Sequence, residues 1–526
     1  MQAFAALLDR LVLTPSRNGK IRLLVDYYRT TADPDRGYGL AAITGDLAIA
    51  SVKPAMLRGL IVERMDEVLF GYSYDYVGDL AETIALVWPA QPRDRHVPRL
   101  SEVVEALHAA SRLEGPRLVE RWLDELDSAG RYALLKLVTG ELRIGVTARL
   151  AKQALAQFGG KEVTEIEEVW HGLRAPYVEL FAWLEGRAER PVSASLAPFR
   201  PVMLAHALDE AEFAKLQPQD YAAEWKWDGI RVQASSEKGV RRLYSRTGDD
   251  VSGAFPDILD CLDFDGSIDG ELLVAREEGG LVEVAPFGDL QQRLNRKTVS
   301  QKLVQSHPAF VRAYDLLQEG EEDLRPLPFA ERRRRLETFV ARLSTSRIDL
   351  SPIVPFESWE QLAELRKSPP TDGRIHEVAE GLMLKRWDSA YVPGRPKGPW
   401  FKWKRDPFIV DAVLMYAQRG HGRRSSFYSD YTFGVWSGPE EAPELVPVGK
   451  AYFGFTDEEL RELDRFVRNN TTERFGPVRA VRAEPSHGLV LEVAFEGLNR
   501  SARHRSGIAM RFPRINRLRW DKPPGE

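Results

Sequence analysis

The sequence predicts a multidomain protein in which an all-α region, an α+β region and a mostly β region follow one another. Up to about residue 190, apolar residues recur at helical spacing. From about residue 203 the segments alternate like strands, and after residue 407 short strand-like segments dominate. A chain of 526 residues is long enough for about three or four domains. We therefore expect domains over residues 1–190, 191–406 and 407–526.

The composition is that of an ordinary soluble globular protein, with 43% hydrophobic and 29% charged residues. The N-terminus lacks a basic stretch followed by a long apolar core, and no run approaches the roughly 18 apolar residues of a membrane helix. We expect neither a signal peptide nor a membrane span. The single cysteine, Cys261, excludes a disulfide framework and a four-cysteine zinc site, and it fits a reducing cytoplasm.

Positive charge is local in this sequence rather than general. The net charge of −5 is not that of a typical nucleic-acid-binding domain. Between Arg500 and Lys522, however, eight cationic residues stand against the single acid Asp521. Such a cluster could bind phosphates in an acidic protein. A solvated tail is the alternative, but it would not need the apolar residues that interleave with the arginines: Ile508, Met510, Phe512, Ile515 and Leu518.

Five stretches of the first region carry apolar residues at the spacing of a buried helix face. They start at Phe4, Ile21, Val103, Leu118 and Leu150. A helical bundle is the expected class.

The stretch from Lys136 to Val146 stands out in this region because Gly140 and Gly145 flank a short segment that carries Arg143. Glycines permit the close approach of a backbone, and helix N-termini attract phosphate. From the residues alone two interpretations stay open. The segment contacts a phosphate-bearing partner, or it is a joint between two helices that packs internally.

A small, polar stretch over residues 186–202 marks the first domain boundary, with Pro198 and Pro201 near its end. Five strand-like segments follow, at Leu243–Asp250, Ser267–Ala275, Phe310–Leu317, Glu380–Lys385 and Trp400–Asp406. A helix is expected from Pro328. We expect its basic run, Arg332 to Arg335, to be a solvated face.

The most unusual stretch is Glu224 to Arg231, in which Lys226 lies between two tryptophans and is followed by Asp-Gly. Strand alternation puts Tyr221, Ala223, Trp225 and Trp227 on one face and the charged Glu224, Lys226 and Asp228 on the other. Aromatic walls and neighbouring cations would favour the neutral, nucleophilic amine. The alternative is a surface strand with a salt-bridged lysine.

Other polar residues of the middle region lie on or beside expected strands, which bring distant residues to one surface. These residues are Lys226, Asp228, Arg231, Arg246, Asp269, Glu271, Glu380, Lys385, Lys402 and Lys404. A nucleophilic amine, carboxylates for Mg²⁺ and several cations suit a triphosphate. The sequence contains neither a P-loop motif nor the kinase motifs. Attack of the lysine on the α-phosphate would give a covalent phosphoramidate.

The third region combines short strands with a single helix. Strands are expected over Val410–Ala417, Phe427–Trp436, Leu445–Lys450 and Leu489–Phe495. A helix should begin at Thr456, with Glu459 completing a capping box. This pattern favours a small barrel of the OB type.

The stretch from Glu224 to Arg231 resembles motif I of the covalent nucleotidyltransferases, which are the DNA ligases, RNA ligases and mRNA capping enzymes. Further motifs of that superfamily follow in order: Ser245-Arg246, Asp269-Gly270-Glu271, Phe310 to Leu317, Glu380 to Lys385, Lys402-Trp403-Lys404, and Arg511 to Arg514 with Arg519 to Lys522. A single motif is weak evidence for membership of this superfamily, but the whole set in this order is very specific to it.

The first region resembles, within that superfamily, the helical DNA-binding domain of ATP-dependent DNA ligases, through the stretch Leu137 to Val146. The segment Ala417 to Arg424 resembles the start of their OB domain. The resemblance implies a compact bacterial or archaeal three-domain ligase: an all-α DNA-binding domain, an α+β nucleotidyltransferase (ATP-grasp-like ligase) domain and an all-β OB-fold domain. It also implies DNA contact at Arg143 and Gly145.

The resemblance implies that Lys226 attacks ATP and becomes adenylylated. The AMP then passes to the 5′-phosphate of a nick, and the 3′-hydroxyl displaces it. Metal contacts are expected from Glu271 and Glu380. The residues expected to bind ATP or AMP are Glu224 at the adenine edge, Tyr314 stacked on adenine, Arg231, Arg246 and Glu271 at ribose and phosphates, Lys402 and Lys404 at the α-phosphate, and Arg511, Arg514 and Lys522 at the leaving group.

The implied cofactors are ATP as AMP donor and Mg²⁺ or Mn²⁺, and the implied partner is nicked double-stranded DNA. By the same resemblance we expect a monomeric repair enzyme of the cytoplasm and nucleoid, with a nuclease or helicase as partner and no membrane contact. Two alternatives remain: an RNA-joining or capping enzyme, which the helical region disfavours, and a non-catalytic DNA-end-binding scaffold, which the complete set of site residues disfavours. An NAD⁺-dependent ligase is disfavoured by the missing cysteine quartet.

Overall fold

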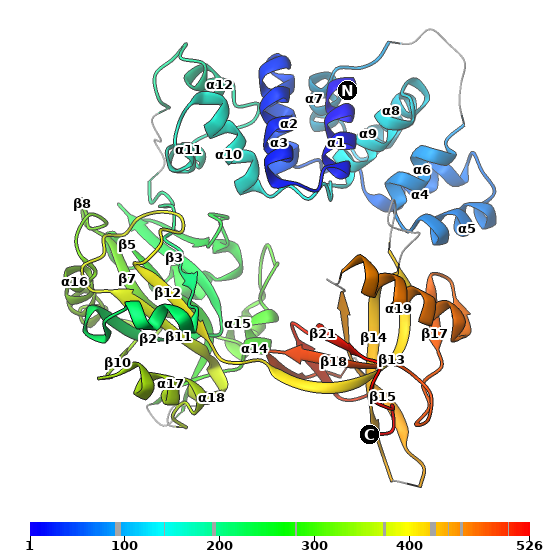
Figure 1. Ribbon diagram of the computed structural model, residues 1–526. Coiled ribbons are helices and arrows are strands. Elements are labelled where there is room, and N and C mark those ends of the chain that lie inside the picture. Colours follow the sequence, from blue (N-terminus) through cyan, green and yellow to red (C-terminus); the bar gives the residue numbers. More distant parts are fainter. Residues whose placement is uncertain are drawn as a thin grey trace. The chain divides into compact units, whose positions relative to one another are not determined.

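A computed structural model describes residues 1–89, 96–140, 142–191, 196–278, 281–371, 375–420, 428–439, 441–452, 456–502 and 504–526 (Figure 1). The chain divides into two compact units. One unit contains Met1–Lys161, Arg174–Arg190 and Pro407–Glu526, and the other contains Glu162–Leu173 and Pro191–Asp406. The helical region, the middle region and the C-terminal region are described separately below.

The N-terminal region is helical, as the apolar spacing predicted. Its helices are α1 (Gln2–Leu13), α2 (Arg17–Thr30), α3 (Asp35–Thr44), α4 (Pro54–Val62), α5 (Glu67–Val77), α6 (Leu80–Val87), α7 (Leu100–Ala109), α8 (Glu114–Glu125), α9 (Ser128–Thr139), α10 (Ala148–Gly159), α11 (Val163–Trp170) and α12 (Val178–Leu184). Each of the five predicted stretches falls inside one of these helices. Side chains at helix starts accept the first backbone N–H groups, as Ser16 does for α2 and Thr147 for α10. No helix in the described part of the chain is long and apolar enough to cross a membrane.

The middle region contains two β-sheets. The first has the strand order β1-β12-β11-β2-β10, built from β1 (His206–Ala207), β2 (Tyr221–Trp227), β10 (Ile353–Val354), β11 (Ala379–Arg386) and β12 (Trp400–Lys404). The second has the order β4-β3-β5-β7-β8, with β6 beside β5 and β9 beside β7. Its strands are β3 (Ile230–Glu237), β4 (Val240–Ser245), β5 (Gly266–Glu278), β6 (Leu281–Val284), β7 (Ala309–Glu319), β8 (Glu322–Asp323) and β9 (Ile348–Leu350).

Short helices connect these strands. They are the 3₁₀ helices η1 (Glu210–Lys215), η2 (Pro218–Asp220) and η3 (Ser252–Ala254), and the α-helices α13 (Pro256–Leu259), α14 (Phe287–Gln291), α15 (Gln301–Ser306), α16 (Phe329–Ala341), α17 (Trp359–Lys367) and α18 (Ile375–Val378). The strands predicted around residues 243, 267, 310, 380 and 400 are all present, as β4, β5, β7, β11 and β12.

Strand β2 buries one face in the core of the first sheet. Tyr221, Ala223, Trp225 and Trp227 all belong to a single buried cluster, together with apolar residues of β11 and β12. This is the face that strand alternation predicted. The indole N–H of Trp227 also donates to the hydroxyl of Ser351, at 2.9 Å. The tryptophans therefore anchor the strand in the core of the first sheet. The charged residues between them face the opposite side.

Helix α16 corrects one expectation. Its basic run was expected to be a solvated face, but Arg332 and Arg333 are buried. Arg332 pairs with the equally buried Asp315 of β7, with 2.8 Å between Nε and Oδ1. Arg334 does lie on the solvated side, with its side chain 67% exposed. The helix packs on β7, so its inward side carries two arginines into the protein.

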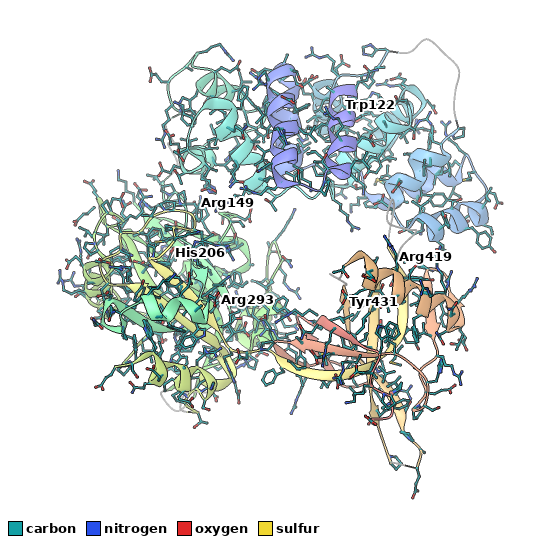
Figure 2. The ribbon with its side chains drawn as sticks, in the orientation of Figure 1. Trp122, Arg149, His206, Arg293, Arg419 and Tyr431 are labelled. Atoms are coloured by element: carbon teal, nitrogen blue, oxygen red, sulfur yellow. The ribbon has the colours of Figure 1, made fainter. Side chains whose placement is uncertain are left out.

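The C-terminal region is rich in β-strands. Its strands are β13 (Phe408–Arg419), β14 (Tyr428–Ser437), β15 (Glu444–Tyr452), β16 (Thr471–Phe475), β17 (Val478–Val481), β18 (Val490–Phe495), β19 (Gly497–Arg500), β20 (Ile508–Arg511) and β21 (Arg514–Arg519). One sheet runs β15-β14-β13-β17-β16, with β18 between β13 and β21, and β19 pairs with β20. Helix α19 (Asp457–Asn469) starts with the predicted capping box at Thr456. The buried Tyr431 lies in the core of this region (Figure 2).

Two predicted features of this region fall partly outside the described residues. Phe427, the expected start of one strand, and His421 to Arg424, in the segment that resembles the start of the OB domain, belong to this undescribed part.

Candidate active site

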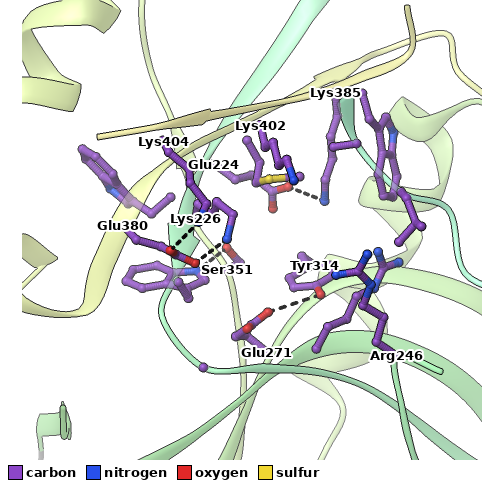
Figure 3. Close-up of a pocket in the computed structure, with 18 of the residues that line it drawn as sticks. Glu224, Lys226, Arg246, Glu271, Tyr314, Ser351, Glu380, Lys385, Lys402 and Lys404 are labelled. Atoms are coloured by element: carbon purple, nitrogen blue, oxygen red, sulfur yellow. Dashed lines mark hydrogen bonds and ion pairs between the residues drawn. The ribbon is translucent and has the colours of Figure 1, made fainter. Parts of the chain in front are cut away.

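One cavity in the middle region brings together most of the residues that the sequence singled out (Figure 3). It has a volume of about 400 Å³, and residues of both sheets line it. The residues of its lining that the sequence singled out are Glu224, Lys226, Arg231, Arg246, Glu271, Tyr314, Glu380, Lys385, Lys402 and Lys404. The first and last of these, Glu224 and Lys404, are 180 positions apart in the chain and still share one site.

Three neighbouring strands of the first sheet supply the lysines of the site. Strand β11 lies between β2 and β12, and its Met383 stands opposite Glu224 on one side and Lys402 on the other. Since side chains alternate along a strand, Lys226 shares the face of Glu224, and Lys404 shares the face of Lys402. This common face is the one that lines the cavity.

Glu380 reaches the same face because β11 contains an irregularity. Strict alternation would put Glu380 beside the buried Leu382, away from the cavity. The register between β11 and β2 shifts between Ala379 and Leu382. At this shift Gly381 has φ +146°, and a Cβ there would lie 2.3 Å from the carbonyl oxygen of Trp403. Glycine therefore permits the bulge that turns Glu380 into the cavity.

Lys226 and Lys404 share the carboxylate of Glu380. The Nζ of Lys226 donates a hydrogen bond to Oε1 of Glu380, and the Nζ of Lys404 lies 3.5 Å from Oε2 (Figure 3). The side chains of Lys226 and Glu380 are 22% and 26% exposed. Although burial raises the pKa of Glu380, Lys226 and Lys404 outweigh it and hold this pKa below its ordinary value. The cluster combines an amine, a carboxylate and a second cation within reach of a ligand.

Glu224 lies in a second, more deeply buried charge cluster. Its Oε2 is 2.6 Å from the Nζ of Lys385, and its Oε1 is 3.3 Å from the guanidinium of Arg333. The side chains of Glu224 and Lys385 are each only 2% exposed. The ammonium of Lys385 also lies 4.6 Å from the ring centre of Tyr314 and 4.8 Å from that of Trp400. The cluster thus connects the carboxylate to the aromatic wall of the cavity.

Arg231 enters the site from the second sheet. It stands opposite Glu271 in the pairing of β3 with β5. Its guanidinium binds the buried Asp269 at 2.6 Å and the hydroxyl of Tyr391 at 3.0 Å. Tyr391 donates in turn to the same carboxylate oxygen of Asp269. The predicted Arg231 is therefore fixed at the cavity wall by a buried carboxylate.

Glu271 and Tyr314 are neighbours in the cavity, with the tyrosine hydroxyl 3.4 Å from Oε2 of Glu271 (Figure 3). Burial raises the pKa of Glu271 to about 8, against the opposing effect of Lys226 and Arg231. Burial also raises the pKa of Tyr314 well above its ordinary value. A carboxyl group with this raised pKa holds a proton near neutral pH, and a nearby cationic ligand would displace that proton.

Lys402 belongs to a group of cations that line the cavity. Burial lowers its pKa, and the positive charges of Arg395, Lys226, Lys404 and Arg246 lower it further. Such mutual repulsion is relieved when a polyanion binds between the cations. The arrangement suits the phosphates of a nucleotide.

The sequence interpretation missed several residues that build the cavity. Arg395 and Ser351 line it but lie outside the recognised motifs, and Trp400 lines it from the start of β12. Arg333 reaches it indirectly, through Glu224 and through the backbone oxygen of Ser351, 2.7 Å away. A sequence signal did exist for Arg333. It lies with Arg332 on the helix stripe that contains Phe329 and Leu336, at the i, i+3, i+4, i+7 spacing of an inward face.

The described carboxylates are too few for a cage made of protein ligands alone. Within the described ranges, no three His, Cys, Asp or Glu side chains gather as a metal-binding group. Mg²⁺ fits such a site, because it usually keeps several waters and takes one or two carboxylates together with substrate phosphates.

The predicted phosphate-binding residues of the C-terminal region lie on and after its last strands. Arg511 ends β20 and Arg514 begins β21. Arg514 lies 3.6 Å from Glu496, and Lys522 forms an ion pair with Asp411 at 2.9 Å. None of the three belongs to the lining of the cavity described above.

The predicted DNA-contacting segment lies between α9 and α10 in the helical region. Leu142 and Ile144 are buried, while Arg143 and Gly145 are exposed. The backbone oxygen of Gly145 accepts a hydrogen bond from Lys20 at 2.9 Å. The apolar residues of this joint therefore pack internally, while its arginine lies at the surface. Glu141 of the same motif is not among the described residues.

Comparison with known proteins identifies the family. Residues 202–404 match the family described as ATP dependent DNA ligase domain, and residues 424–522 match the ATP dependent DNA ligase C terminal region. A probable DNA ligase of Koribacter versatilis is 30% identical over 555 aligned positions, which cover 99% of this chain and 94% of the relative. DNA ligase 1 of Korarchaeum cryptofilum is 29% identical, covering 100% and 96%.

A solved structure described as Pmar-Lig_PreS3 has a similar fold, with a TM-score of 0.58 at 15% identity, covering 98% of this chain and 99% of that one. The family matches, the full-length relatives and the lysine-centred cavity agree with one another. This chain belongs to the ATP-dependent DNA ligases, and it uses ATP to seal nicks in DNA.

Proposed function

We propose that Lys226 is the residue that carries AMP during nick sealing. The observation that supports this most directly is the shared carboxylate of Glu380, which holds the Lys226 amine beside a second cation in the nucleotide-sized cavity. A surface lysine in a solvated salt bridge would not be enclosed in this way.

The chemistry then proceeds through three displacements at phosphorus. In the first, Lys226 gives up a proton and its nitrogen attacks the α-phosphorus of ATP, so a P–N bond forms and the P–O bond to pyrophosphate breaks. In the second, an oxygen of the 5′-phosphate at the nick attacks the same phosphorus, and the P–N bond breaks. In the third, the 3′-hydroxyl attacks the 5′-phosphate, the phosphodiester bond forms and AMP leaves.

The other lining residues fall into three roles. Lys402 and Lys404 would neutralise the phosphoryl oxygens, and Arg231 and Arg246 would contact ribose and phosphates. Tyr314 would stack on adenine, and Glu224 would accept a hydrogen bond at the adenine edge.

Glu271 and Glu380 would hold Mg²⁺ or Mn²⁺. Their number fits a metal that keeps its waters, and both face the cavity. The metal would supply charge neutralisation on the phosphates. The sharing of Glu380 with two lysines is compatible with this role, because the phosphates would offer the lysines an alternative partner.

The other two regions would serve the DNA and the leaving group. The C-terminal region would be an OB-type barrel whose Arg511, Arg514 and Lys522 orient pyrophosphate, hinged near residues 405–407. The helical region would bind DNA phosphates around Arg143 and Gly145, so affinity for nicked DNA should fall with salt. We further propose a monomer that acts in repair in the cytoplasm and nucleoid, beside a nuclease or helicase.

Labelling with ATP that carries ³²P at the α-position tests the central proposal. We expect a covalent AMP on the protein, its loss in Lys226→Ala, and its discharge when nicked DNA is added. Lys238→Ala, which removes an exposed lysine of the β3–β4 turn, is the matched control and should label normally. Full labelling of Lys226→Ala would exclude this lysine as the AMP carrier.

A further inference from the structure

Arg333 is a buried arginine outside every recognised motif that contacts the wall of the active site. It lies on α16 and is 5% exposed. One of its terminal nitrogens, Nη1, donates both to Oε1 of Glu224, at 3.3 Å, and to the backbone oxygen of Ser351, at 2.7 Å. Its Nε donates to Glu337 of the same helix at 2.9 Å. One guanidinium thus ties a helix that packs on the second sheet to two segments lining the cavity.

The contact with Arg333 helps to fix the orientation of the Glu224 carboxylate. Its two oxygens receive different cations, Arg333 on Oε1 and Lys385 on Oε2. Because a carboxylate is planar, contacts on both oxygens fix the plane and leave its remaining lone pairs in one direction. Glu224 lines the cavity, so those lone pairs form a preset acceptor for a ligand. A carboxylate held by Lys385 alone could rotate about its last bond.

We propose that Arg333 is a positioning residue that sets Glu224 for the 6-amino group of adenine and against a 6-oxo purine. The inference rests on the proposed contact between Glu224 and adenine. A preset acceptor favours the binding of a base that carries a hydrogen-bond donor at C6. A carbonyl oxygen at C6 would instead face the carboxylate with no hydrogen between them. Arg333 touches neither the nucleotide nor the reacting atoms in this scheme, and it acts through Glu224.

The test compares ATP with inosine 5′-triphosphate, which carries an oxygen in place of the amino group at C6 and a hydrogen on N1, in the adenylylation of the full-length protein. In Arg333→Met we expect the KM for ATP to rise about tenfold, the loss typical of a misplaced charge-assisted hydrogen bond, with the maximal rate changed less than about threefold. The preference for ATP over inosine triphosphate should fall by about the same factor. Arg333→Lys, which keeps the charge, should restore part of it.

Two variants separate positioning from a general loss of structure. Arg334→Met changes the neighbouring arginine, whose side chain is 67% exposed and pairs with Glu331, and should behave as wild type. In a Glu224→Gln background, Arg333→Met should change the nucleotide preference no further, because the residue through which it acts is already altered.

Equal losses for ATP and inosine triphosphate in Arg333→Met would overturn the inference, and so would a full further loss in the Glu224→Gln background. These outcomes are distinct from failure of the proposed function. A wild-type protein that takes no label from ATP removes the lysyl-AMP proposal, and a Glu224→Gln variant with unchanged preference removes the adenine contact.

Discussion

Two charge clusters on strand β2 differ sharply although their first residues, Glu224 and Lys226, are two positions apart. The Lys226 cluster is partly open, with its carboxylate shared by two lysines that are 22% and 41% exposed. The Glu224 cluster is almost dry, with all three side chains at or below 5% exposure. Charges that must change partners during a reaction stay near solvent, where exchange costs little. Charges that define a shape are buried, where each ion needs its partner.

The largest effect is expected from a substitution that breaks the buried cluster. Glu224→Ala leaves Lys385 and Arg333 without their common carboxylate, which should destabilise the middle region by about 3–5 kcal/mol. Glu380→Ala, in the open cluster, should cost only about 1 kcal/mol, since its partners can turn to water. Hydrogen-exchange protection of the β2 amides in the full-length protein measures both. Similar losses in the two variants would contradict the distinction between the clusters.

A second prediction concerns the backbone that joins the open cluster to the sheet. Gly381→Ala places a Cβ against the carbonyl oxygen of Trp403 at a φ that side chains rarely adopt, so β11 must shift. We expect a cost of roughly 2–3 kcal/mol in the protection of β11. Adenylylation should also slow by about tenfold or more, as Glu380 leaves Lys226. Gly398→Ala, which also has positive φ but open space around its Cβ, is the control for backbone strain alone.

The most gradual expected effect is a pH dependence that belongs to Glu271. Its pKa is raised to about 8 in the folded protein, mainly by burial, so the folded state binds a proton that the unfolded state has already lost. Stability therefore falls as pH rises between about pH 5 and about pH 8. Glu271→Gln removes this contribution. The difference in unfolding free energy between variant and wild type should then grow in the variant's favour by at most about 1.4 kcal/mol per pH unit.

Unfolding followed across that pH range, without nucleotide or divalent metal, measures the difference. A difference that stays constant with pH would show that Glu271 titrates alike in the folded and unfolded protein.

The local pattern of β2 could be predicted from sequence because large apolar residues and charged residues alternate there along the strand. Alternation separated the core face of Trp225 and Trp227 from the charged face of Lys226, and the structure has the same separation. The helical period of the first region and the capping box at Thr456 were equally clear. In each case neighbouring residues decide the outcome.

The parts that sequence reasoning missed depend on distant contacts or on broken periods. Glu380 faces the cavity only through the bulge at Gly381, which alternation alone would not predict. The arginines of α16 look like a solvated run until their spacing with Phe329 and Leu336 is considered. The partnership of Arg333 with Glu224 joins residues 109 positions apart and has no local signature.

The position of β2 within its sheet has a consequence for how the enzyme comes into being. Both hydrogen-bonded neighbours of β2, which are β10 and β11, follow it by more than a hundred residues in the chain. The hydrogen bond between Lys226 and Glu380 spans 154 positions. A growing chain therefore exposes Lys226 long before the strands that complete the cavity have been synthesised. Lys226 meets its carboxylate only when β11 has joined the sheet, and Lys402 and Lys404 follow with β12. Under the proposed mechanism, adenylylation competence therefore arises only with the finished domain.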